Sequence, residues 1–154
     1  MTQIDFYTHV EDKLRTACRL AAKAYSTELR VMVCCPDADI AGRFDRMLWT
    51  TPAIGFIPHC LAADPLAPET PILIDYAGAE PRHDEVLLNL KPEWPPLFSR
   101  FQRLIEIVSI EDEDRRLARE RFRFYRDRGY EIRTHDLSKA GHSDFTPPPS
   151  QPSP

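Results

Sequence analysis

Residues 29–39 read Leu-Arg-Val-Met-Val-Cys-Cys-Pro-Asp-Ala-Asp, and this stretch decides the fold class. Its first seven positions are apolar apart from Arg30, as expected of a strand that is covered on both faces. Pro36 ends the strand, and Asp37 can cap the helix that follows. The core stripe of that helix consists of Ile40, Phe44, Met47 and Leu48. A buried strand followed at once by an amphipathic helix is the repeating unit of α/β proteins.

The same alternation continues on both sides of this stretch. Before it, residues 4–7 are expected to form a short strand and residues 11–25 a helix. After it, the apolar runs predict strands at 71–74, 86–90, 104–110 and 130–133. A loop is expected at 77–81, a short helix at 95–103 and a basic helix after 111–114. We therefore expect a mostly parallel α/β sheet with helices on both faces.

Length and composition bound the class of protein. The chain has 154 residues, 42% hydrophobic and 29% charged, which is ordinary for one soluble globular domain. We expect a single domain over 1–138 and a disordered, proline-rich tail over 139–154. No apolar run approaches the roughly 20 residues of a membrane span, and the N-terminus has no signal-peptide pattern. A cytoplasmic protein is expected, and its four cysteines are expected to be buried, reduced thiols.

The turns after the first two strands argue against a bound nucleotide. Residues 8–12 contain no glycine, and residues 35–39 place two carboxylates where a phosphate would lie. No Cys/His spacing suggests a metal, so no cofactor is expected. His59 and Cys60 are adjacent, and adjacent residues in a strand point to opposite faces, which disfavours a catalytic pair. A small α/β enzyme is therefore the weaker hypothesis, and we assign no catalytic residue.

Charge is distributed unevenly along the chain. The formal net charge is −4, which argues against general binding of nucleic acid. Residues 115–128 nevertheless hold seven arginines against Glu120 and Asp127, a local net charge of +5. A basic segment on an acidic protein suggests one dedicated anionic partner.

The helical periodicity of this basic segment separates two rows of side chains. The expected buried arc consists of Leu117, Ala118, Phe122, Tyr125 and, at its flank, Phe124. Arg115, Arg119 and Arg126 lie in one row beside Phe122. An acidic peptide that ends in an aromatic side chain would complement this arrangement. The alternative is a solvated charged helix in which Arg116 pairs with Glu120.

A second candidate surface lies at the end of the preceding helix. Leu48 and Trp49 are followed, after a proline-constrained loop, by Phe56 and Pro58. Tryptophan at such a place is either core packing or the anchor of an interface, because aromatic residues dominate binding hot spots.

These two stretches resemble a known family. Residues 43–49 (Arg-Phe-Asp-Arg-Met-Leu-Trp), residues 56–61 (Phe-Ile-Pro-His-Cys-Leu) and residues 117–126 (Leu-Ala-Arg-Glu-Arg-Phe-Arg-Phe-Tyr-Arg) look like the characteristic segments of the chi subunit of bacterial DNA polymerase III. The resemblance runs from about residue 5 to residue 136 and leaves the proline-rich tail outside. It implies a Rossmann-like fold without a nucleotide and a non-catalytic accessory role in the replisome.

The resemblance also implies partners and site residues. Chi pairs with the psi subunit, which tethers it to the clamp loader, and binds the acidic C-terminal tail of single-stranded DNA-binding protein. The implied tail-binding residues are Val108, Arg115, Arg119 and Phe122, with Arg126 in the same row. The family often has lysine at the position of Arg115 and tyrosine at that of Phe122, so a hydroxyl is missing here. The implied surface for psi, or for a helicase-like partner that competes for it, comprises Leu48, Trp49, Phe56 and Pro58.

One further alternative stays open at this point. The arginine-rich helix could bind nucleic acid directly, whereas the resemblance implies contact through single-stranded DNA-binding protein and no direct nucleic-acid binding.

Overall fold

The computed structural model describes residues 1–50 and 57–138. Seven strands form one sheet: β1 (Gln3–Val10), β2 (Val31–Cys34), β3 (His59–Leu61), β4 (Ile72–Asp75), β5 (Val86–Asn89), β6 (Arg103–Ser109) and β7 (Ile132–Asp136). Within the described residues, three α-helices accompany them: α1 (Lys13–Ser26), α2 (Ala38–Thr50) and α3 (Asp112–Asp127). The predicted strands and long helices are confirmed, with shifted ends. The helix expected at 95–103 is wrong, since only a 3-10 turn, Phe98–Arg100, forms there.

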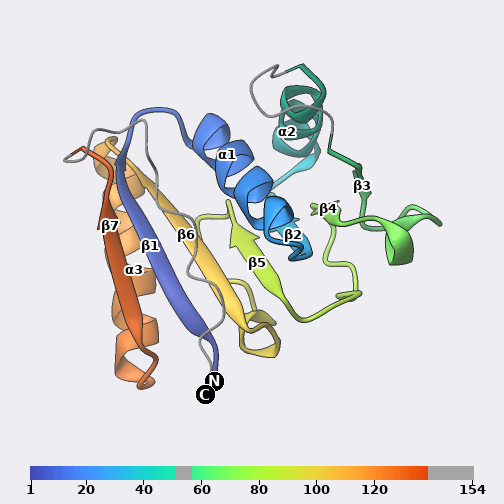
Figure 1. The fold of residues 1–154 in the computed structure, drawn as a ribbon. Helices are drawn as coiled ribbons and strands as arrows, with labels where there is room; N and C mark the ends of the chain where they lie inside the picture. The colour runs from blue at the N-terminus through green and yellow to red at the C-terminus, as the bar shows by residue number, and fades with distance from the viewer. Residues whose placement is uncertain (51–56, 139–154) are drawn as a thin grey trace.

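The strand order is β3-β4-β2-β5-β6-β1-β7, and every pairing is parallel. Parallel neighbours need crossover connections, which lay helices over the faces of the sheet. Figure 1 shows α1 and α2 on one face and α3 on the other. The α/β class and the expectation of helices on both faces are therefore confirmed.

Local signals in the sequence explain where the helices begin and end. The Asp12 carboxylate accepts a hydrogen bond from the backbone N–H of Arg15 (3.1 Å) and caps α1. Asp37 caps α2 in the same way through the N–H of Ile40 (2.9 Å), as predicted. Gly129 follows α3 with a φ of +85°, a conformation that costs glycine little.

The core has one layer on each face of the sheet. Alternate residues along β1 go to opposite layers: Ile4 and Phe6 pack toward α3, whereas Tyr7 and Val10 pack toward α1. On β2, Val31 and Val33 pack toward α1 and α2, and Met32 packs on the other side. The continuous apolar run of β2 is thus explained by burial on both faces.

All four cysteines are free, with Cys18 and Cys35 buried and the other two half-buried. Burial raises the pKa of Cys18, Cys34 and Cys35 to about 12, which keeps these thiols protonated at neutral pH. No helix among the described residues is long and apolar enough to cross a bilayer. The expectations for Phe56 and for the tail at 139–154 lie outside the described residues.

Candidate functional site

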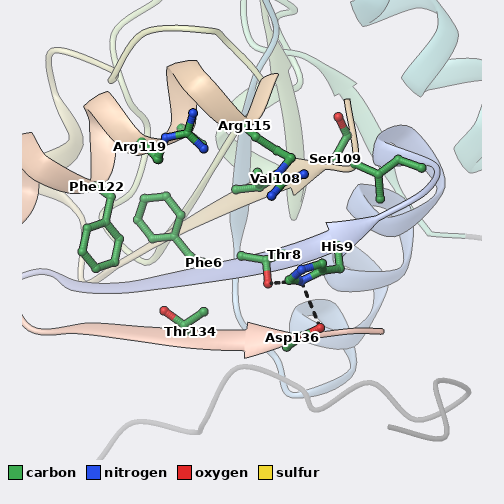
Figure 2. Close-up of a pocket in the computed structure, with 12 residues that line it drawn as sticks. Phe6, Thr8, His9, Val108, Ser109, Arg115, Arg119, Phe122, Thr134 and Asp136 are labelled. Atoms are coloured by element: carbon green, nitrogen blue, oxygen red, sulfur yellow. Dashed lines mark hydrogen bonds and ion pairs between the residues drawn. The ribbon is translucent and has the colours of Figure 1, made fainter. Parts of the chain in front are cut away.

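A cavity of about 490 Å³ opens at the carboxyl end of the sheet, between α3 and the strands β1, β6 and β7 (Figure 2). It is lined by Phe6, Thr8, His9, Val108, Ser109, Ile110, Arg115, Ala118, Arg119, Phe122, Thr134 and Asp136. This volume falls in the range of ordinary ligand sites. We call it the α3 pocket.

The topology of the sheet explains the position of the α3 pocket. β1 and β6 are parallel neighbours, yet β1 continues into α1 on one face and β6 into α3 on the other. Where neighbouring strands send their connections to opposite faces, a crevice is left at their carboxyl ends, and α/β proteins bind ligands there.

The floor of the α3 pocket is apolar. Phe6 and Phe122 meet edge to face, with ring centroids 5.4 Å apart. Val108 and Ala118 are buried beside them, while Phe122 itself is half-buried. A partner's apolar side chain would displace water from this floor without disturbing the core beneath it.

The α3 side of the pocket is cationic. Arg115 and Arg119 lie one turn apart on α3 and are exposed. Within residues 1–50 and 57–138, neither guanidinium makes an ion pair or a side-chain hydrogen bond. Two unpaired positive charges beside an apolar floor fit an anionic ligand with an apolar end.

Most other arginines of the basic segment already have partners. Arg116 contacts the carboxylates of Glu113 (2.6 Å) and Glu120 (3.0 Å), and the latter is the pair predicted from the spacing. Arg126 pairs with Asp127 (3.1 Å) and does not line the pocket. Arg128 lies over the ring of Phe124, 4.0 Å from its centroid. Of the arginines on α3 without such a partner among the described residues, Arg115 and Arg119 line the α3 pocket and Arg123 does not.

The opposite wall of the pocket carries a His–Asp pair. His9 Nδ1 lies 3.0 Å from the Asp136 carboxylate and 3.0 Å from the Thr8 hydroxyl. An irregularity in β1 between Tyr7 and Val10 brings His9 to this wall, where its φ is +62°. Asp136 is the one carboxylate that lines the pocket among the described residues, so the two walls differ in charge.

Between α3 and the sheet, a buried charged cluster fixes α3 in place. The Glu106 carboxylate, fully buried on β6, accepts hydrogen bonds from Arg121 Nε (2.9 Å), the Tyr125 hydroxyl (2.6 Å) and Asn89 Nδ2 (3.1 Å). Arg121 also donates to the Pro92 carbonyl (2.8 Å). Burial raises the pKa of Glu106, and the attraction of Arg121 opposes that rise. Four polar groups thus satisfy one another in the core.

This cluster corrects the predicted buried arc of α3. Ala118 and Tyr125 are buried as expected, but Leu117, Phe122 and Phe124 are only half-buried. The side chain at the centre of the arc is that of Arg121, which the sequence analysis had counted among the basic residues. Its burial is possible because Glu106 neutralises it.

The structure brings four of the predicted tail-binding residues together. The α3 pocket is lined by Val108, Arg115, Arg119 and Phe122. The Arg126 guanidinium forms an ion pair with Asp127 and does not line the pocket. Sequence reasoning missed Phe6, His9 and Asp136, which come from strands distant in the chain.

The second predicted surface is only partly available to a partner. Trp49 is 59% exposed at the end of α2 and meets the ring of His59 edge to face, at 4.9 Å. Pro58 is half-buried, and Phe56 lies outside the described residues. Leu48 was predicted as an interface residue, and this is wrong: it is 1% exposed because it packs in the core under α2.

His59 and Cys60 lie on opposite sides of β3. His59 Nε2 is 3.2 Å from the Asp45 carboxylate on α2, whereas Cys60 packs toward Leu73 in a separate cluster. The predicted separation of imidazole and thiol is confirmed. In the part of the chain that the structure describes, no three His, Cys, Asp or Glu side chains are grouped as metal ligands.

Comparison with known proteins identifies the family of the chain. Residues 1–133 match the family model described as "DNA polymerase III chi subunit, HolC". The DNA polymerase III subunit chi of Pseudomonas aeruginosa is 35% identical over 143 residues, covering 90% of this chain and 99% of the relative. Those of Escherichia coli K12 and Haemophilus influenzae are 31% and 30% identical, covering 86% and 79% of this chain and 89% and 85% of theirs. The chain belongs to the chi subunit family of DNA polymerase III, the accessory subunits of a replication enzyme.

Proposed function

We propose that this protein is a non-catalytic adaptor whose α3 pocket binds the acidic C-terminal tail of single-stranded DNA-binding protein. The observation that carries the proposal is the placement of two unpaired guanidiniums, Arg115 and Arg119, beside an apolar floor. Side-chain carboxylates of the tail would pair with the arginines, and its terminal aromatic side chain would cover Phe6 and Phe122.

The magnitudes predict a weak and reversible contact. Each exposed arginine–carboxylate contact contributes about 1 kcal/mol, and burial of one large apolar side chain contributes about 1.5–3 kcal/mol. A micromolar affinity is expected for one tail. Several tails on one coated strand of DNA would raise the effective concentration, so the adaptor would be retained without tight binding at any single site.

The exposed Trp49 supports a second half of the proposal. A large aromatic side chain at the end of α2 is a suitable anchor for the psi subunit, or for a helicase-like partner that uses the same surface. This surface lies at the β3 end of the sheet, whereas α3 lies at the β7 end (Figure 1). One molecule could therefore hold both partners at once and link the clamp loader to coated DNA.

The α3 pocket can be tested with a tail peptide, by varying the salt concentration and the terminal residue of the peptide. We expect a peptide ending in Asp-Asp-Ile-Pro-Phe to bind with a dissociation constant that rises about tenfold between 50 and 300 mM salt. Replacing its terminal phenylalanine with alanine should weaken binding about tenfold or more, because the apolar floor is left uncovered. Isothermal titration measures both changes. Equal affinity of the two peptides would contradict the assigned pocket.

Direct binding of DNA by α3 is the competing function, and it makes a different prediction. Because Arg116, Arg121 and Arg126 already pair with carboxylates, naked single-stranded DNA should not be shifted in a gel at physiological salt. Addition of single-stranded DNA-binding protein should produce a supershift. A shift of naked DNA by this protein alone would favour the competing function.

Two neighbouring residues test the second surface. We expect Trp49→Ala to weaken binding of the psi subunit about 30-fold and leave stability nearly unchanged, because the indole is 59% exposed. Leu48→Ala should do the reverse: it should lower the free energy of unfolding by about 2–5 kcal/mol and leave the affinity of the folded protein unaltered. Surface plasmon resonance and urea unfolding measure the two effects.

A further inference from the structure

The sheet contains a second place where neighbouring strands send their connections to opposite faces. β2 continues into α2 on one face, while its neighbours β4 and β5 continue into segments on the other face. The segment that follows β2 crosses to the face opposite α3, so it does not cover the carboxyl end of β2 on the α3 face. The rule that places the α3 pocket between β1 and β6 therefore predicts another crevice above the end of β2.

A cavity of about 240 Å³ is present at this crevice, and we call it the β2 pocket. Its apolar lining comes from β2, β5 and the segment before β6: Met32, Cys34, Leu87, Leu97 and Phe101. An apolar cavity of about 150 Å³ accommodates benzene, so this one has room for a single aromatic side chain. Leu97 at its rim is 37% exposed, which extends the apolar surface outward.

Two charged side chains, Asp75 and Lys91, line the β2 pocket, and they have different roles. The Asp75 carboxylate is almost fully buried and accepts hydrogen bonds from the backbone N–H groups of Ala77, Gly78 and Ala79 at 3.1–3.3 Å. It therefore fixes the loop that forms one wall. The Lys91 ammonium makes no ion pair or hydrogen bond with any residue that the structure describes. It is the group available to a ligand.

We infer that the β2 pocket is a second protein-binding site, which takes one aromatic side chain of a partner's peptide segment together with an adjacent carboxylate. Charge complementarity to Lys91 selects the carboxylate, and the apolar lining selects the ring. A peptide is favoured over a small metabolite because Leu97, at the rim of the cavity, is 37% exposed and offers apolar surface toward solvent. This site lies on different strands from the α3 pocket and does not depend on the function proposed there.

The test uses N-acetylphenylalanine and its uncharged amide as probes, with ¹⁵N resonances of the full chain as the readout. Measurements in the Arg119→Glu background suppress binding at the α3 pocket. We expect saturable shifts of Gly78, Ala79 and Leu97, with the acid binding about fivefold more tightly than the amide.

Variants of Lys91 distinguish specific binding of the probes in the β2 pocket from non-specific binding. Lys91→Met keeps the apolar stem and removes the charge, so the acid and the amide should bind equally. Lys23→Met, an exposed lysine on α1, is the matched control and should retain the fivefold preference. The inference is overturned if the probes shift none of the residues of the β2 pocket, or if the preference for the acid survives in Lys91→Met.

Discussion

Replacement of Arg119 with glutamate is expected to weaken binding of the acidic tail peptide at least about 100-fold. The guanidinium lines the α3 pocket and has no partner among the described residues, so its substitution removes a charge-assisted hydrogen bond without breaking an internal pair. The new carboxylate also repels the carboxylates of the peptide. A loss of about 3 kcal/mol corresponds to this change in affinity. Isothermal titration at low salt measures it, and the fold should be unaffected.

Arg123→Glu is the matched control for this experiment. Arg123 is exposed on the same helix, and it does not line the α3 pocket. The same reversal of charge there should change the affinity less than about threefold, through screened long-range attraction alone. If both variants lose binding equally, the net charge of the helix matters rather than the pocket, and the proposed site is wrong.

Removal of the buried Arg121 is expected to have the largest effect on stability. Arg121→Ala leaves the Glu106 carboxylate buried without its counter-charge, which should lower the free energy of unfolding by about 3–5 kcal/mol. Such a loss is a large fraction of the 5–15 kcal/mol typical of a domain. Urea unfolding followed by circular dichroism measures it.

Two further variants show whether this loss comes from the unpaired charge. Arg116→Ala, on the exposed side of α3, should cost less than about 1 kcal/mol although Arg116 contacts two carboxylates. Combining Arg121→Met with Glu106→Gln should recover most of the stability that Arg121→Ala loses, because no charge is then buried alone and the amide oxygen still accepts from the Tyr125 hydroxyl. A double variant as unstable as Arg121→Ala would show that packing, rather than charge, determines the loss.

The fold class could be predicted because a strand that is buried on both faces has a continuous apolar sequence. The apolar run of β2 and the helical stripe of α2 are adjacent, and each predicts its own element. The helix expected at 95–103 was wrong because the spacing of Phe98 and Phe101 fits one turn as well as a helix. Both rings are buried, but the short connection to β6 leaves room only for a 3-10 turn.

From residue spacing alone, the candidate site could be predicted only where it lies on one element, and Val108 on β6 was named only through the family resemblance. Arg115, Arg119 and Phe122 share a helix face, so their spacing alone places them together. Phe6, His9 and Asp136 reach the pocket through the order of the strands, which local patterns do not encode. Arg121 could have been found, since it falls at the centre of the apolar arc, where an arginine requires a buried acid.

The place of β1 in the sheet has a consequence for synthesis of the protein. The first strand made pairs with the last two, Gln3 with Arg103 and Ile4 with Ile132, so about a hundred residues must emerge before it finds a neighbour. At rates of synthesis of about 5–20 residues per second, an apolar strand waits unpaired on the ribosome for at least roughly five seconds. The α3 pocket, which needs β7, is completed last. A nascent chain therefore lacks the complete α3 pocket until β7 has emerged, so the tail proposed to bind there could be captured only after nearly all of the folded region has been made.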